Sequence, residues 1–204
     1  KQVHNGVMVK ETVDSNHDRE LAVRLGLSVK SNINELKSYF FTDPKLKQAD
    51  DSMQAIGLID EDAPDFSGVH LDDDMVHAYL KATAGSGLNL SKQEISACQA
   101  LAKHGGQKTE VEKHFQTLLL NRYKSYRDQG LAGILPYHRK GGIDFHPGDE
   151  LRLSLQAASL LKKECPLFHN AALNYPNSRP KGLEESFFWL NALTDDKTTV
   201  SLMH

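Results

Sequence analysis

Alternating apolar and polar positions predict strands in the first and last parts of the chain. The clearest case runs from Leu21 to Val29, where every second residue is Leu or Val and the residues between are small or polar. This period of two is typical of a strand that buries one face. Further strands are predicted at residues 7–13, 53–59 and 198–203.

Apolar residues recur at helical spacing through the middle of the chain. The acids at residues 72–74 complement the positive end of a helix dipole and predict a helix to about Lys81. Residues 91–94 have the form of a capping box, and residues 109–112 repeat it before the longest helix, which ends near Gly130. Other helices are predicted at residues 150–163, 167–175 and 183–193, with a short one from Ser31 or Asn32 to Pro44.

Strands at both ends with helices between them predict an α+β fold. We expect a single domain over residues 1–204, with a small antiparallel sheet and a helical insertion or cap. Residues 1–70 are its strand-rich part and residues 71–182 its helical part. Residues 183–204 are predicted to form a helix and a terminal strand.

The C-terminal segment gathers bulky apolar residues beside the last predicted strand. Phe187, Phe188 and the only tryptophan, Trp189, precede a strand that runs to the end of the sequence. A strand presents unpaired backbone groups at a sheet edge, and nothing later in the sequence can pair with this one. We therefore expect something outside the chain to complete its apolar surfaces.

The composition is that of an ordinary soluble protein. Of 204 residues, 39% are hydrophobic and 25% are charged, and the net charge is −3. This balance argues against bulk disorder and gives no electrostatic footprint for nucleic acid. Apolar runs such as residues 118–120 are too short to cross a bilayer. We expect no nucleic-acid partner and no transmembrane segment.

Two features bear on the cellular compartment, and neither decides it. The first residue is lysine, which fits removal of an export signal and trimming of the chain equally well. Cys98 and Cys165 allow one disulfide bond. Because Cys98 lies among small apolar residues of a predicted helix, we favour a buried free thiol over a bridge.

Ten histidines raise the question of a metal site. None of His104, His114, His138 and His146 has a second histidine or cysteine at helical ligand spacing. The acidic residues 60–68 lack the alternating ligands and the closing glutamate of an EF-hand calcium loop. We therefore predict no metal ion.

Candidate catalytic groups are few. Glu184, Glu185 and His204 are candidates for an acid and a base near a strand end. Adjacent carboxylates on a helix point to different parts of its surface, so we interpret both acids as residues of a helix start. No serine lies in a nucleophile elbow, and no glycine loop has the pattern of a phosphate-binding loop. We predict no catalytic residues, no cofactor and no enzyme activity.

Residues 121–127 mix basic and aromatic side chains, as do surfaces that bind single-stranded nucleic acid. Helical spacing places Tyr123 and Tyr126 on the apolar side of the longest predicted helix, and Lys124 and Arg127 on its outer side. We interpret the two tyrosines as core residues whose hydroxyl groups reach water.

Several segments, read in order, resemble an uncharacterised family of bacterial exported proteins. They are residues 19–23 (Arg-Glu-Leu-Ala-Val), residues 56–58 (Ile-Gly-Leu), residues 121–123 (Asn-Arg-Tyr) with Tyr126 and Gly130, residues 185–187 (Glu-Ser-Phe) with Trp189, and Val200 and Ser201 with His204. The resemblance implies a START-like (helix-grip) opening, a fold incomplete at the C-terminus, and a periplasmic or outer-membrane-associated location. It supplies no catalytic residues. The chain departs from the family at Leu202 and Met203, where a threonine is usual, and lacks a cysteine pair near residues 85–88.

Two functions are compatible with these observations. The first is a non-catalytic cell-envelope protein that is a structural or accessory subunit of a larger assembly, such as a type IVB secretion outer-membrane complex. Its partners would be other protein subunits. The alternative is a START-like protein that binds a lipid or another apolar ligand, with Phe187, Phe188 and Trp189 lining a pocket between helix and sheet.

Overall fold

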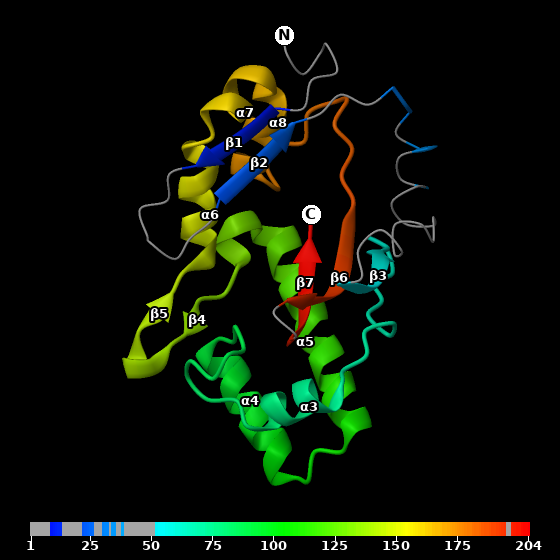
Figure 1. Ribbon diagram of the computed structural model, residues 1–204, viewed down its shortest axis with the longest axis vertical. Helices are drawn as coiled ribbons and strands as arrows, with labels where there is room; N and C mark the ends of the chain where they lie inside the picture. The colour runs from blue at the N-terminus through cyan, green and yellow to red at the C-terminus, as the bar shows by residue number, and fades with distance from the viewer. Residues whose placement is uncertain are drawn as a thin grey trace.

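The fold is known from a computed structural model and is α+β, as predicted (Figure 1). The structure describes residues 9–13, 22–26, 30–32, 34–35, 38, 52–194 and 197–204. Within these residues, the main sheet has one strand at residues 53–59 and two strands after residue 186. The chain between the first strand and the other two is mostly helical. The predicted helical insertion is therefore confirmed.

The main sheet has three antiparallel strands in the order β3 (Met53–Ile59), β6 (Phe187–Thr194) and β7 (Lys197–Met203). The predictions at residues 53–59 and 198–203 are confirmed. β7 lies at an edge of this sheet, and its strand neighbour among the described residues is β6. The last strand of the chain thus pairs with the segment just before it.

A separate hairpin pairs β1 (Val9–Val13) with β2 (Ala22–Gly26) in antiparallel register. Both strands lie inside the ranges predicted at residues 7–13 and 21–29, and the ends of those ranges fall outside the described residues. The expected cap of the following short helix is present, since Asn32 Oδ1 accepts a hydrogen bond from the backbone N–H of Glu35 at 2.9 Å. The predicted end of that helix at Pro44 also falls outside the described residues.

The predicted helix at residues 183–193 is wrong, because β6 occupies most of that range. Phe187 and Trp189 are buried toward the helices, whereas Phe188 and Leu190 are half-buried on the opposite face of the sheet. β6 pairs with a strand on each side, so it is a central strand with apolar residues on both faces. Such a run does not show a clear period of two, and its sequence resembles that of a buried helix.

The helical part follows the predicted order with two changes. Its helices are α3 (Asp73–Leu80), α4 (Lys92–Lys103), α5 (Lys108–Gln129), α6 (Pro147–Gln156), α7 (Ser159–Glu164) and α8 (Pro166–Asn174). The single helix expected at residues 150–163 is two helices, α6 and α7, that are interrupted at Ala157 and Ala158. The connection from α5 to α6 holds two 3-10 turns, η2 (Gly130–Gly133) and η3 (Lys140–Gly142), and the short strands β4 (Tyr137–His138) and β5 (Asp144–Phe145).

Helix caps explain where α3, α4 and α5 begin. Asp72 accepts a hydrogen bond from the N–H of Met75 at 2.7 Å, and Ser91 with Glu94 forms the predicted capping box. The box of α5 lies two residues earlier than predicted, because Gln107 and not Thr109 is the cap residue. α5 ends at Gly130, whose φ of 60° favours glycine.

The core lies between α5 and the inner face of the main sheet, with α3 and α4 at one end of α5 and α6 to α8 toward the other (Figure 1). The indole of Trp189 lies flat against β3. A Cβ atom on Gly57 would come within 2.4 Å of that ring, so only glycine fits opposite it. Both cysteines are free, with Cys98 buried and Cys165 exposed, which confirms the favoured interpretation. No helix in the described part of the chain is both long and apolar enough to span a membrane.

Candidate functional site

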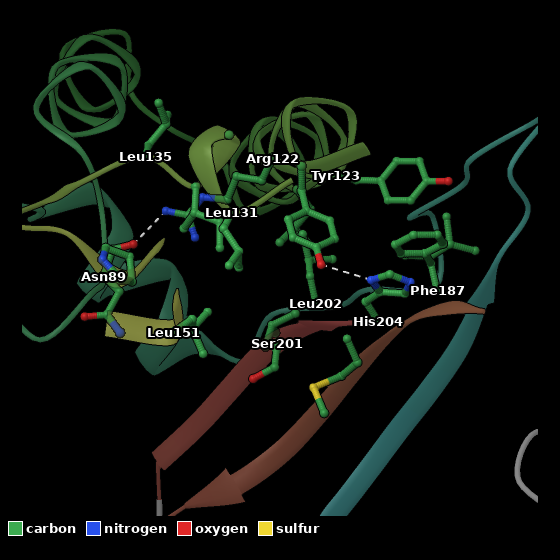
Figure 2. A pocket seen from close by; sticks show the side chains of 18 of the residues that line it. Asn89, Arg122, Tyr123, Leu131, Leu135, Leu151, Phe187, Ser201, Leu202 and His204 are labelled. Atoms are coloured by element: carbon green, nitrogen blue, oxygen red, sulfur yellow. Dashed lines mark hydrogen bonds between the residues drawn. The ribbon is translucent and has the colours of Figure 1, made fainter. Parts of the chain in front are cut away.

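A groove of about 530 Å³ lies between α5, β7 and the segment that follows α5 (Figure 2). Its floor is one face of α5, its first wall is β7 with His204, and its second wall is residues 131–137 with Pro147 and Leu151. The lining is mainly apolar. The floor is formed by Leu119, Arg122, Tyr123 and Tyr126.

The groove follows β7 and also reaches under the end of the main sheet, where Ile59 of β3 and Phe187 of β6 line it. Each of the consecutive residues 200–204 lines it. Successive side chains of a strand point to opposite faces of a sheet. Residues of both faces of β7 therefore line the groove, which places part of it beside this strand. Part of the groove thus lies on the side of β7 opposite β6, where none of the other described strands is placed.

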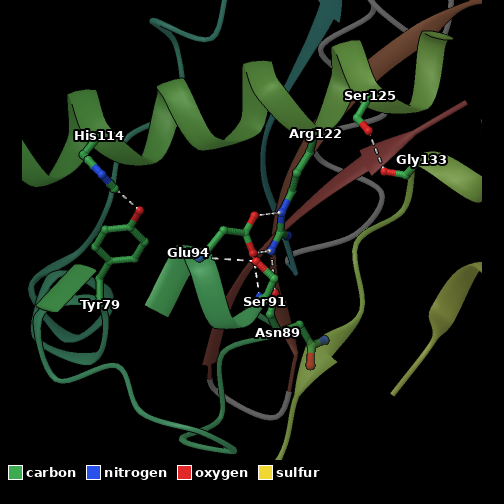
Figure 3. Close-up of polar contacts among 8 residues, drawn as sticks. All are labelled: Tyr79, Asn89, Ser91, Glu94, His114, Arg122, Ser125 and Gly133. Carbon is green, nitrogen blue, oxygen red and sulfur yellow. Dashed lines mark hydrogen bonds and ion pairs between the residues drawn. The ribbon is translucent and has the colours of Figure 1, made fainter. Parts of the chain in front are cut away.

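Arg122 brings a charge to the floor of the groove, and Glu94 of α4 balances it (Figure 3). Arg122 Nε donates to Glu94 Oε1 at 2.7 Å, and Nη2 donates to Glu94 Oε2 at 2.8 Å and to the carbonyl oxygen of Asn89 at 2.6 Å. Burial raises the pKa of Glu94, but the hydrogen bonds and charge of Arg122 outweigh it and leave this pKa below its ordinary value. A guanidinium and a carboxylate that share two hydrogen bonds form a strong ion pair with a fixed relative orientation.

Arg127 packs against the core, contrary to the prediction that it lies on the outer side of α5. Its guanidinium carbon is 5.2 Å from the centre of the Phe187 ring and 5.9 Å from that of Tyr123. Glu61, at the start of the acidic loop, forms an ion pair with it. Tyr123 is buried and Lys124 is exposed, as expected. Arg127 thus links the loop after β3 to α5 and β6.

His204 closes one end of the groove. Its ring stacks on Phe187 with centroids 4.3 Å apart, and its Nδ1 lies 2.9 Å from the hydroxyl of Tyr126. Its Nε2 lies 3.4 Å from Glu185 Oε2. Burial raises the pKa of Tyr126 to about 12, so its hydroxyl keeps its proton and can donate to a neutral His204.

Glu185 does not belong to a helix start, which corrects the interpretation made from the sequence. It precedes β6 and lies 3.1 Å from Nη1 of Arg179 as well as near His204. Glu184 is exposed. The two adjacent acids therefore differ in environment because a strand, not a helix, follows them.

The stability of the fold is expected to fall as pH drops below about 6.5 through His204. Burial lowers the pKa of His204, and the nearby guanidinium groups of Arg127 and Arg179 act in the same direction, against Glu185. The folded state therefore binds the proton less well than the unfolded chain does. The resulting stability is present above the ordinary pKa of 6.5 and is lost as pH falls through the lowered value.

Urea denaturation between about pH 8 and pH 5 checks this expectation. The matched variant His204→Phe keeps an aromatic ring on Phe187 and cannot titrate. We expect its stability to change less with pH than that of the native chain. Equal pH dependence in the two proteins would show that His204 is not responsible.

Two of the candidate histidines and one acid of the acidic loop have local partners. His114 Nδ1 lies 2.7 Å from the Tyr79 hydroxyl (Figure 3), and His138 Nδ1 lies 2.7 Å from Asp144 Oδ1. In the acidic loop, Asp60 accepts a hydrogen bond from the backbone N–H of Asp62. Among the described residues, no three His, Cys, Asp or Glu side chains are grouped closely enough to hold a metal ion.

The outer face of the main sheet is a second candidate site. This face, which we call the outer sheet face, carries apolar residues that are not fully covered: Ile56, Leu58, Phe188, Leu190 and Met203. Leu58 is 56% exposed and Met203 is 41% exposed. Strand alternation places them opposite the core side, where Ile59, Phe187 and Trp189 are buried.

Phe187, Phe188 and Trp189 were predicted to line a pocket between helix and sheet, and one of the three lines the groove. Phe187 lines the groove, Phe188 lies on the outer sheet face, and Trp189 is buried in the core. Sequence reasoning missed the second wall of the groove and the pairing of Arg122 with Glu94. A charged residue in the apolar stripe of the longest helix was the signal for that pair.

Comparisons with known proteins add no assignment. No protein-family model, no curated protein and no solved structure matches the chain.

Proposed function

We propose that this protein is a non-catalytic subunit of a larger assembly and that its outer sheet face binds a partner protein. The observation that carries this proposal is the set of apolar side chains on that face, with Leu58 56% exposed at one edge strand and Met203 41% exposed at the other. Contiguous apolar surface of this kind marks interaction sites in soluble proteins.

The groove supports a binding role over a catalytic one. Its two basic side chains already have partners, since Arg122 is held by Glu94 and His204 lies between Tyr126 and Glu185. Both groups are therefore engaged in holding α4, α5 and β7 together. The remaining lining is mainly apolar, which favours binding.

The setting that we propose is the bacterial cell envelope. It rests on the sequence resemblance to exported proteins, which implies a periplasmic or outer-membrane-associated location. Accessory subunits of a type IVB secretion outer-membrane complex are one such setting. Their partners would be other protein subunits of the complex.

The assembly proposal is tested on protein purified under mild conditions from cells that make it. Size-exclusion chromatography with light scattering is expected to give a mass above that of one chain. Leu58→Lys should shift the protein toward the mass of one chain, because it places a charge in the apolar interface. Leu153→Lys on α6 is the matched control, since Leu153 is equally exposed at 56% but lies away from the sheet. A native protein that elutes as a single chain would count against the proposal.

The apolar lining of the groove favours a second candidate, a START-like protein that binds a lipid or another apolar ligand. The volume of about 530 Å³ is within the range of ligand pockets. Native mass spectrometry after exposure to lipid extract tests it. A retained ligand of defined mass would support this candidate, and a spectrum of the bare chain would count against it.

A further inference from the structure

We propose that the groove binds an extended segment of a partner protein, which adds to the edge of β7 that no other described strand covers, as a fourth strand of the main sheet. This inference deepens the assembly function proposed above and rests on it. It names the chemistry of the partner: a peptide in β conformation with apolar side chains at alternate positions. Strand addition to an exposed sheet edge is a recurring mode of peptide recognition.

The position of the groove is the first support. It follows β7 over residues 200–204 and has α5 as its floor, which is also the layer on which the main sheet packs. A strand added about 4.8 Å from β7 would lie in the groove and continue the sheet over α5. The far side of such a strand would face Leu131 and Leu135 (Figure 2).

The backbone of β7 is the second support. Thr194 pairs with Lys197 across a two-residue connection, and the register continues through Ser201 opposite Leu190. In such a hairpin the residues that flank the turn form a hydrogen-bonded pair, and every second residue of the strand turns its N–H and C=O groups away from the partner. Val200 and Leu202 therefore direct backbone donors and acceptors toward the groove.

Charge favours a peptide over a fatty acid or another anionic lipid. The guanidinium group of Arg122 is already neutralised by both oxygens of Glu94. A ligand carboxylate placed beside Arg122 would also lie beside the Glu94 carboxylate, and like charges repel strongly where water is scarce. An uncharged backbone with apolar side chains avoids this repulsion.

The test begins with short random peptides displayed on phage and selected on the full chain. An enriched peptide is then added to the isotopically labelled protein, and the exchange of single backbone amides is followed by NMR. We expect exchange at Val200 and Leu202 to slow by at least about tenfold. The amides of Thr199 and Ser201, which face β6, serve as internal controls and should change little.

Two matched variants locate the binding. Leu135→Glu places a charge in the second wall of the groove without touching β7, and should weaken peptide binding by at least about tenfold. Leu167→Glu makes the same change at an exposed residue of α8 that does not line the groove, and should leave binding unchanged.

Four results would overturn the inference. One is the absence of any peptide enriched on the native chain over Leu135→Glu. Another is peptide binding that leaves exchange at Val200 and Leu202 unchanged. The third is binding of hexadecanoate by the groove when no peptide binds. An assembly that is lost in Leu58→Lys but intact in Leu135→Glu would also overturn it, and would leave the proposed function standing.

Discussion

Replacing Trp189 by alanine is expected to lower the free energy of unfolding by about 3–5 kcal/mol. Trp189 is only 6% exposed and lies at the centre of β6, between Gly57 of β3 and Leu202 of β7. Neither neighbour can fill the space of the lost ring. Gly57 has no side chain, and the backbone of β7 is held in place by its pairing with β6. The cost therefore includes a cavity as well as the lost burial.

Circular dichroism should follow this denaturation, because Trp189 is the only tryptophan and its fluorescence is lost in the variant. Leu190→Ala is the control on the other face of the same strand. Leu190 is half-buried, so its truncation should cost less than that of Trp189. A change within about 0.5 kcal/mol for Trp189→Ala would show that this side chain is not part of the core.

Replacing Arg122 by alanine is also expected to cost about 3–5 kcal/mol. The cost comes from the Glu94 carboxylate, which remains after the guanidinium group is removed. The Glu94 side chain is only 12% exposed, and its position is fixed because it also accepts a hydrogen bond from the N–H of Ser91 at 2.7 Å. Loss of Arg122 leaves a buried charge without its partner. Denaturation by urea measures the loss.

A second change should recover much of that loss. In the double variant Arg122→Met with Glu94→Gln, the buried charge is gone, and glutamine still supports the capping box of α4. A buried ion pair can often be replaced by uncharged groups at little cost. The two single variants for comparison are Arg122→Met and Glu94→Gln. If the loss of unfolding free energy in the double variant equalled the sum of the losses in these two, the side chains would not be coupled and this explanation would fail.

Elements with strong local signals could be predicted from the sequence. β3 has the predicted bounds, α3 begins at the predicted acidic residues 72–74, and α4 begins at the predicted capping box, because Asp72 and Ser91 bind backbone groups only a few residues away. Such contacts depend little on the rest of the fold. The free state of Cys98 was also predicted from its immediate neighbours.

Features that depend on distant contacts could not be predicted. β6 is a strand because β3 and β7 pair with it on both sides, and its own pattern of apolar residues does not reveal this. Arg127 is drawn inward by Glu61 and the ring of Phe187, which are far away in sequence. The groove combines residues from many separate segments, so no single motif marks it.

Photo-crosslinking from position 58 tests the proposed binding of a partner by the outer sheet face most directly. A photoreactive amino acid replaces Leu58 in cells that make the protein, and Leu153 is replaced in the same way as the control. We expect a discrete adduct of defined mass from position 58 and none from position 153. Absence of an adduct at position 58, or equal adducts from both positions, would contradict the proposal that this face binds a partner.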